Sequence, residues 1–409
     1  MVTPIYRIVL PFCLGYFLSY AVRNVNAIIA PDLAHELTLS PSGLGLLTSA
    51  YFLAFAAFQL PLGVLLDRYG SRRVEAVLFL FAGAGCAMFA LGDSVGELVV
   101  ARALIGIGVS GALMGAFRAY VQWFPAERLS LVNGLTMTVG GLGALAATAP
   151  VEALLQITDW RGVLLLMALI ALLASAAVFF GVPRHPDDDK PATESLAQQC
   201  AGVVRVYRSP AFWRVAPLAV TSQAMFLAIQ GLWAGPWFRD VAGFPRDAVA
   251  THLFYITVAM VAGFFSVGVV AERLRRHGVS NVTVATWCCV IALVALILIM
   301  FGVTQLVTFP WLIFGFFGGA GFLFYAVLTE AFPDALAGRV ITCANVLTFA
   351  GAFTAQWGIG AVIDWWPVDG AGHYHPLGYQ AGFGLFLGLT VLSVVWLLLA
   401  PTAKPTHSS

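Results

Sequence analysis

Charged residues are scarce in this chain of 409 residues, in which Asp, Glu, Lys and Arg together make up 10%. Ordinary soluble domains contain roughly a quarter of such residues. Hydrophobic residues make up 60% of the chain, and the net charge is only +1. A soluble core of this length does not need so much apolar surface, so the composition excludes an ordinary soluble enzyme, and the small net charge gives no reason to expect a nucleic-acid partner.

Other features are missing as well. The six cysteines lie in apolar segments or in the central polar stretch, which predicts no disulfide framework. No small-residue cleavage site follows the first apolar run, so we expect a retained helix.

The apolar segments hold no nucleophile–base pair, and no ATP-binding motif occurs, so we expect neither an enzyme nor a cofactor. His373 and His375 predict a solvated turn rather than a metal site.

Long apolar runs take the place of these features. A bilayer core requires about 20 apolar residues per helix. Twelve segments of that size are predicted: 6–30, 43–66, 74–92, 97–122, 130–155, 161–182, 213–238, 248–271, 280–302, 307–331, 340–364 and 378–400. One long polar stretch predicts a cytoplasmic linker at 183–212, between an N-terminal bundle of six helices (1–182) and a C-terminal bundle of six (213–409).

The distribution of basic residues predicts the orientation, because cytoplasmic loops of membrane proteins are enriched in Lys and Arg. With the N-terminus inside, 15 of the 21 basic residues fall on the cytoplasmic side. Three fall outside (Arg161, Arg239 and Arg246), and three fall within spans. We therefore expect a multi-pass protein of the bacterial inner membrane with both termini in the cytoplasm.

A glycine- and charge-rich loop occurs twice. Residues 63–73 read GVLLDRYGSRR, and residues 268–278 read GVVAERLRRHG. Both copies have a glycine, three apolar residues, an acid and an arginine, and the halves also match at 123–128 and 331–334. Matching loops at corresponding places indicate an internal duplication, which in membrane proteins is typical of transporters.

With these motifs the whole chain resembles a major facilitator superfamily transporter. The loop at 63–73 fits the superfamily's signature between helices two and three, and Arg102-xxx-Gly106-x-Gly108 resembles its fourth-helix motif. The loops at 123–128 and 159–161 resemble two further motifs, and 20–33 more weakly resembles the organic-anion symporter branch. The resemblance implies an all-α fold of twelve transmembrane helices in two pseudo-symmetric bundles, in which helices one, four, seven and ten line a central cavity and access alternates between the two sides.

The duplicated loop is interpreted as a conformational lock. A carboxylate at Asp67 would meet the start of helix eleven near Val340 and stabilise the state that is closed on the inside. Gly63 would let helix two approach a neighbouring helix closely. Arginines of the loop would pair with Asp67 or with lipid phosphate, or would merely satisfy the orientation rule. The complete set of lock candidates is Gly63, Asp67, Arg68, Gly70, Arg72, Glu272 and Arg273.

Arginines within the spans suggest the cargo, because an intramembrane charge is costly unless it has a function. Arg23 follows two tyrosines at helical spacing, and a guanidinium in a wet cavity binds carboxylate, sulfonate or phosphate groups; alternatively, it reaches the outer headgroups. Arg118 either contacts substrate or a gate, or extends to the cytoplasmic headgroups. For Arg102 a structural or coupling role is expected. The predicted substrate-binding set is Tyr16, Tyr20, Arg23, Asn24, Arg118, Gln230, Trp233 and Tyr325.

Acids within the spans are few, and we note Glu152 and Glu330. The organic-anion branch carries an aspartate before the helix-one arginine and a glutamate in helix four, where this chain has Val22 and Val109. Either Glu330 or His252 carries a proton instead, or the protein is an exchanger or facilitator. We expect a monomeric, gradient-driven transporter of a small organic anion; the alternative is a proton-driven efflux carrier for drugs or lipophilic metabolites.

Overall fold

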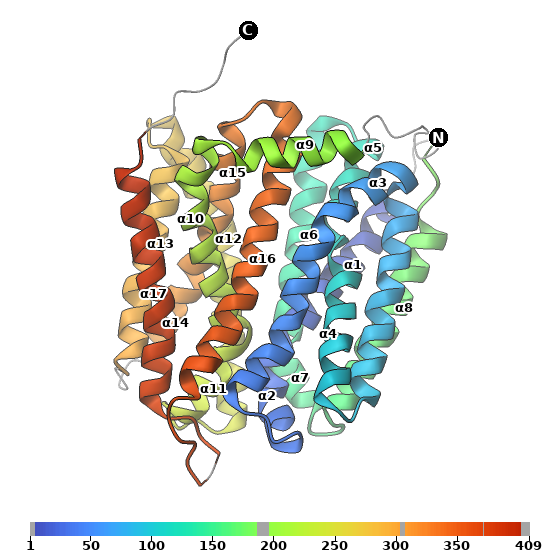
Figure 1. Cartoon of the computed structure of the whole chain (residues 1–409). Coiled ribbons are helices and arrows are strands. Elements are labelled where there is room, and N and C mark those ends of the chain that lie inside the picture. The colour runs from blue at the N-terminus through green and yellow to red at the C-terminus, as the bar shows by residue number, and fades with distance from the viewer. Residues whose placement is uncertain (1–4, 186–195, 303–306, 371, 402–409) are drawn as a thin grey trace. The chain divides into compact units, whose positions relative to one another are not determined.

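The computed structural model describes residues 5–185, 196–302, 307–370 and 372–401, and within these ranges the regular structure is helical. Contacts divide the chain into two compact units. The first comprises residues 1–39 and 46–193, and the second comprises 40–45 and 194–409. The two units are described one at a time, and their helices are coloured along the chain in Figure 1.

The first unit contains α1 (Ile5–Asn24), α2 (Asn26–Glu36), α3 (Pro41–Leu91), α4 (Val95–Val109), α5 (Ala112–Trp123), α6 (Ala126–Ala146), α7 (Ala149–Leu154), α8 (Trp160–Ala176) and the π-helical turn η1 (Ala177–Gly181). Within it, α1 packs along α6 and also contacts α5 and α8. The buried core between these helices is apolar, and includes Phe12, Phe79 and Tyr120.

The second unit contains α9 (Leu196–Tyr207), α10 (Pro210–Ala228), η3 (Ile229–Trp233), α11 (Ala234–Asp240), α12 (Arg246–Arg276), α13 (Asn281–Met300), α14 (Thr308–Gly318), η5 (Gly319–Gly321), α15 (Phe322–Glu330), α16 (Asp334–Ile363) and α17 (Pro376–Leu399). Here α10 packs along α16 as α1 packs along α6 in the first unit. The same pairing of a unit's first and fifth spans in both halves agrees with an internal duplication.

Ten helices in the described ranges are long and apolar enough to cross a membrane, or eleven when the bent pair α1–α2 counts as one span. The helix α3 has 51 residues, which corresponds to about 77 Å at 1.5 Å per residue, whereas a bilayer core is about 30 Å thick. It contains both the segment predicted at 43–66 and that at 74–92. Counted as two spans, it brings the structure to the twelve segments expected from the sequence.

The division of α3 lies at Gly70, whose backbone angles are φ 75° and ψ 158°. This region is open almost only to glycine, because a Cβ would clash with the backbone. In the second copy of the loop, Gly278 follows the end of α12 and also has a positive φ, of 83°. Both copies of the loop thus contain a glycine with a positive φ, although Gly70 lies three residues after Asp67 and Gly278 lies six residues after Glu272.

Several predicted segments are interrupted. The fourth breaks at Ser110–Gly111 between α4 and α5, and the fifth breaks after α6. The seventh passes through a π-helical turn at 229–233, and the tenth through a 3₁₀ turn at 319–321, where glycines follow one another. Such breaks arise where glycine or an inserted residue releases helical hydrogen bonds. Together with the first segment, which bends between α1 and α2, and the sixth, which ends in the π-helical turn η1, six of the twelve predicted helices are therefore not continuous.

The predicted linker contains a helix of its own. Residues 186–195, with the acidic run at 187–189, lie outside the described residues, but α9 follows at once and lies transverse to the helices of its unit (Figure 1). It is held against α16, where the Tyr207 hydroxyl donates to the carbonyl of Cys343 at 3.1 Å. The part of the linker at 196–207 is therefore a docked helix of the second unit rather than a flexible connection.

Candidate functional site

Arg23 lies in the last turn of α1 and is surrounded by aromatic rings of its own unit. Its Nε donates to the hydroxyl of Tyr51 at 3.5 Å. Its Cζ lies 5.0 Å from the ring centre of Tyr20, 5.9 Å from that of Tyr51 and 5.7 Å from that of Phe55. Cation–π contacts of this kind orient a guanidinium without neutralising its charge. The structure thus brings Arg23 together with Tyr20, as the sequence predicted, and adds two aromatic residues from α3.

The other helix-one candidates support this arrangement from the side. Tyr16 is buried and meets Tyr20 edge to face, with ring centres 5.1 Å apart. Asn24 is also buried, and its Nδ2 donates to the backbone carbonyl of Tyr20 at 2.8 Å. Because the Tyr16 ring and the Asn24 amide both contact Tyr20 inside the bundle, they help to position the Tyr20 ring beside Arg23.

Arg102 holds the bend of the first span. The helices α1 and α2 meet at 45°, with Val25 between them. Arg102, on α4, is fully buried, and its Nη1 donates to the carbonyl of Val22 at 3.1 Å while its Nη2 donates to the side-chain carbonyl of Asn26. In a continuous helix the carbonyl of Val22 would accept from the N–H of Asn26. Arg102 therefore bonds to both sides of the bend, and its Cζ also lies 4.5 Å from the ring centre of Phe89.

Asp67 and Arg118, expected in different roles, form an ion pair. Nη1 of Arg118 on α5 donates to the carboxylate of Asp67 on α3, and both side chains are partly exposed. The sequence interpretation placed Asp67 against the start of helix eleven and let the loop arginines pair with it or with lipid phosphate. Arg72 is directed elsewhere, since its Nε donates to the carbonyl of Phe179 at 2.8 Å, and Arg68 lies over the ring of Tyr69. The helical backbone turns Arg72 away from Asp67, whereas α5 brings Arg118 to it.

The lock glycine and the second copy of the loop also differ from expectation. Within its own unit, a Cβ on Gly63 would meet no atom within 4 Å, so the close helix approach predicted there does not occur in that unit. In the second copy, Glu272 accepts from Arg275 at 3.0 Å and from Arg276 at 3.4 Å, one helical turn along α12. Arg273 lies on the same turn and is exposed.

The candidates of the second unit lie on two helical segments, η3 and α15. Gln230 and Trp233 are buried in the π-helical turn η3, and the indole N–H of Trp233 donates to the backbone carbonyl of Gln356 at 2.9 Å. Tyr325, on α15, is half-buried and donates from its hydroxyl to Thr348 at 3.4 Å. A π-helical turn at such a point displaces side chains from the regular helical face, which places Gln230 and Trp233 on a locally widened turn.

The two proton-carrier candidates lie near helix ends. Glu330 is exposed at the end of α15 and accepts from Nδ2 of Asn281 at 3.1 Å. His252 is half-buried, with its ring nitrogens 2.7 Å from the carbonyl of Ala248 and 3.1 Å from the hydroxyl of Thr308. Its ring centre lies 5.2 Å from that of Phe238 and 4.6 Å from that of Phe244, and these two rings stack on each other. The structure thus places Glu330 in solvent and His252 in an aromatic cluster.

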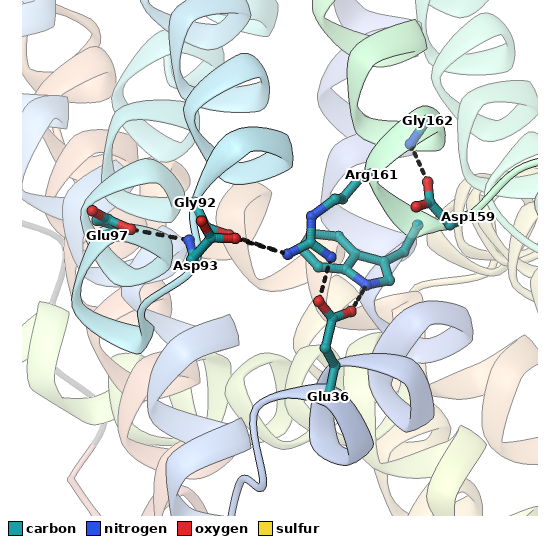
Figure 2. A network of polar contacts seen from close by, with 8 residues as sticks. Glu36, Gly92, Asp93, Glu97, Asp159, Arg161 and Gly162 are labelled. Carbon is teal, nitrogen blue, oxygen red and sulfur yellow. Dashed lines mark hydrogen bonds and ion pairs between the residues drawn. The ribbon is translucent and has the colours of Figure 1, made fainter.

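A polar network closes the end of the first unit at which α2 ends and α8 begins (Figure 2). Glu36 accepts from the indole N–H of Trp160 at 2.7 Å and pairs with Arg161 at 2.5 Å. Arg161 also pairs with Asp93 at 3.3 Å. The motif at 159–161 therefore links the loop before α4 to the end of α2, while Asp159 caps α8 by accepting from the N–H of Gly162 at 2.8 Å.

Two carboxylates of structural note were missed by the sequence reasoning. Glu75, in the second half of α3, is fully buried; its place at the start of the segment 74–92 made it resemble an ordinary helix-end acid. Asp240 accepts from the Tyr379 hydroxyl at 2.5 Å and pairs with Arg239. Beside this pair, burial raises the pKa of the Tyr374 hydroxyl to about 12.

Sequence comparison gives the family. A profile of the Major Facilitator Superfamily matches residues 12–356. The chain belongs to this superfamily. Relatives of this superfamily member include a probable sulfoacetate transporter of Cupriavidus necator, 26% identical over 281 residues, with 65% of this chain and 64% of that protein covered. They also include the hexuronate transporter of Escherichia coli strain K12, 25% identical over 367 residues, with 84% and 83% covered.

Structural comparison agrees with this assignment. A D-xylose–proton symporter of known structure superposes on this chain with a TM-score of 0.77, at 18% sequence identity, over 99% of each chain. At that identity the match shows the fold alone. The relatives are transporters rather than enzymes, and the twelve-span, two-bundle architecture expected from the duplicated loop is that of the superfamily.

Proposed function

We propose that this protein is a secondary transporter of a small organic anion and that Arg23 binds the anionic group. The observation that carries the proposal is the guanidinium of Arg23 in an aromatic setting on helix one. The rings of Tyr20 and Phe55 and the hydroxyl of Tyr51 hold it in place. A planar guanidinium is suited to bidentate bonds with a carboxylate or sulfonate.

The relatives support this substrate class. Sulfoacetate contains a sulfonate and a carboxylate, and a hexuronate contains a carboxylate on a polyhydroxylated body; these are the cargoes that the relatives' names give. A single arginine that recognises the shared anionic group suits both.

We further propose that transport proceeds by alternating access between two bundles, driven by an ion or counter-substrate gradient. The duplicated loop and the internal repeat of helix pairing support this mechanism. The excess of basic residues in one set of loops supports an inner-membrane protein with both termini in the cytoplasm.

Counterflow in proteoliposomes tests the substrate class. Vesicles loaded with unlabelled glucuronate or sulfoacetate are expected to take up the same labelled compound. Arg23→Ala should abolish this uptake, and Arg23→Lys should weaken binding roughly 10- to 150-fold, the equivalent of one hydrogen bond to a charged group at about 1.5–3 kcal/mol. Both variants should remain folded, because the carbonyl and amide contacts that hold the bend belong to Arg102.

Tyr51→Phe is the matched control. It removes the hydroxyl contact to Arg23 but retains the ring, so affinity should fall by less than tenfold. Unchanged anion affinity in folded Arg23→Ala would refute the assignment of Arg23. Transport of lipophilic cations but of neither anion would instead support the efflux alternative.

A further inference from the structure

Glu75 is a carboxyl group buried within the first unit. It lies five residues after Gly70 in α3, about 7–8 Å of helix from the loop. Its side chain is 0% exposed. Among the described residues, neither of its carboxyl oxygens has a hydrogen-bond partner. The hydroxyl of Ser71, one turn earlier, is buried and unbonded as well.

The helix α5 leaves room for this carboxyl group. A Cβ added to Gly111 would lie 2.4 Å from Oε1 of Glu75, and one added to Gly115 would lie 2.1 Å from it. Side chains of Leu62 and Leu78 complete the surroundings at Gly111. Two glycines at a spacing of four therefore form a groove on one face of α5 that the acid of α3 fills. The space is specific to that group, since any larger residue at either glycine would displace it.

Ionisation of a carboxyl group in such a place is strongly unfavourable, because burial removes the water that stabilises the charge. The neutral acid avoids most of this penalty but still forgoes the hydrogen bonds that it would make in water. A leucine of similar volume would avoid both penalties. An acid that is retained at a net cost, in space that two glycines provide, indicates a functional group rather than a structural one.

Two arginines near Glu75, Arg118 and Arg72, bind other groups in this structure. Arg118 lies on the same face of α5 as Gly111 and Gly115, at i+7 and i+3, and pairs with Asp67. Its Nε is buried and has no hydrogen-bond partner. Arg72, three residues before Glu75, donates to the carbonyl of Phe179. Among the described residues neither arginine pairs with Glu75, so the acid is uncompensated while Arg118 has a donor to spare.

We propose that Glu75 is the proton-binding group through which this protein couples transport to a proton gradient. In the state seen here the carboxyl group holds its proton. A shift of α5 along α3 opens the glycine groove; the O–H bond breaks, the proton passes to water, and the carboxylate left behind takes Arg118 as its counter-charge while Asp67 becomes solvated. The inference rests on the proposed function, because coupling requires a transported anion.

Two transport modes in proteoliposomes test this. Net uptake of labelled glucuronate or sulfoacetate driven by a pH gradient requires proton release, whereas exchange of labelled for unlabelled anion at equal pH does not. Glu75→Gln, which mimics the protonated acid, should lose gradient-driven accumulation at least tenfold and retain exchange. Glu75→Asp should restore part of the coupling. Glu127→Gln, at an exposed acid at the start of α6, should behave as wild type.

A measurement without substrate separates the two proposals. The infrared spectrum of the purified protein should contain a protonated carboxyl C=O band that is lost in Glu75→Gln and retained in Glu127→Gln. Wild-type exchange without gradient-driven accumulation, full accumulation by Glu75→Gln, or absence of the band would overturn the role of Glu75. Failure of wild type to move either anion, with the band present, would overturn the proposed substrate class and leave Glu75 as a proton-binding group.

Discussion

The bend in the first span should depend on Arg102. This guanidinium is fully buried on α4 and donates to Val22 before the bend and to Asn26 after it. Replacing Asn26 by leucine leaves a buried charge with one partner fewer. Replacing Arg102 by leucine leaves the Asn26 amide without its donor. Each single change should therefore destabilise the first unit, and the two effects should not add.

The magnitude follows from the kind of bond. A hydrogen bond to a charged group contributes about 1.5–3 kcal/mol, and removal of one partner adds the desolvation cost of the other. For folding units of 150–250 residues, 1 kcal/mol shifts Tm by roughly 2–4 °C. We expect each single variant to lower Tm by about 3–12 °C, and the double variant to lower it by less than the sum, with a coupling of about 1.5–3 kcal/mol.

Thermal unfolding of the wild type, the two single variants and the double variant in one detergent, monitored by intrinsic tryptophan fluorescence, measures this double-mutant cycle. Arg128→Leu is the matched control, because Arg128 is an exposed arginine of the same unit, and its loss should change stability by no more than about 0.5 kcal/mol. Additive losses, within roughly 0.5 kcal/mol, would show that Arg102 and Asn26 act independently. That result would refute the reasoning that a single guanidinium holds the bend.

Two further predictions concern the loops. Gly70→Ala should lower Tm, because its φ of 75° and ψ of 158° cost a residue with a Cβ about 1–3 kcal/mol. Gly63→Ala, in a part of the helix where a Cβ meets no atom, should instead raise the free energy of unfolding by up to about 1 kcal/mol. The opposite order of the two stabilities would contradict the backbone argument. Glu36→Gln should lower the free energy of unfolding by less than about 1 kcal/mol, because the ion pair with Arg161 is partly exposed. Thermal unfolding at low and high salt should show that this destabilisation decreases as salt is added. A destabilisation that does not depend on salt would argue against an ionic role.

The sequence predicted the fold because its signals are local. Apolar length specifies the spans, and a glycine that must adopt a positive φ specifies the loop at Gly70. The breaks inside spans were not predictable, because packing of neighbouring helices decides where a helix yields at Gly111 or at 229–233. For the same reason the partner of Asp67 was missed, since Arg118 is 51 residues away in the chain.

Candidate residues were predicted with similar limits. Intramembrane arginines are conspicuous, so Arg23 and Arg102 were recognised from the sequence, together with the tyrosines one and two turns before Arg23. The rings of Tyr51 and Phe55 come from another helix and could not be placed beside it. Glu75 was overlooked because two residues separate it from a loop arginine, and only the tertiary structure shows that α5 buries it.

Arg102 and Arg23, the arginine that we propose binds the anion, are linked through helix one. Arg23 follows Val22 directly and precedes Asn26 by three residues, so it lies between the two acceptors of Arg102. Its guanidinium can meet a substrate in a fixed orientation only while the bend is fixed, because a binding group is effective when its support is rigid. Arg102 variants should therefore lose stability and affinity together, whereas Arg23→Lys should lose affinity alone. Comparison of these two losses separates positioning from binding.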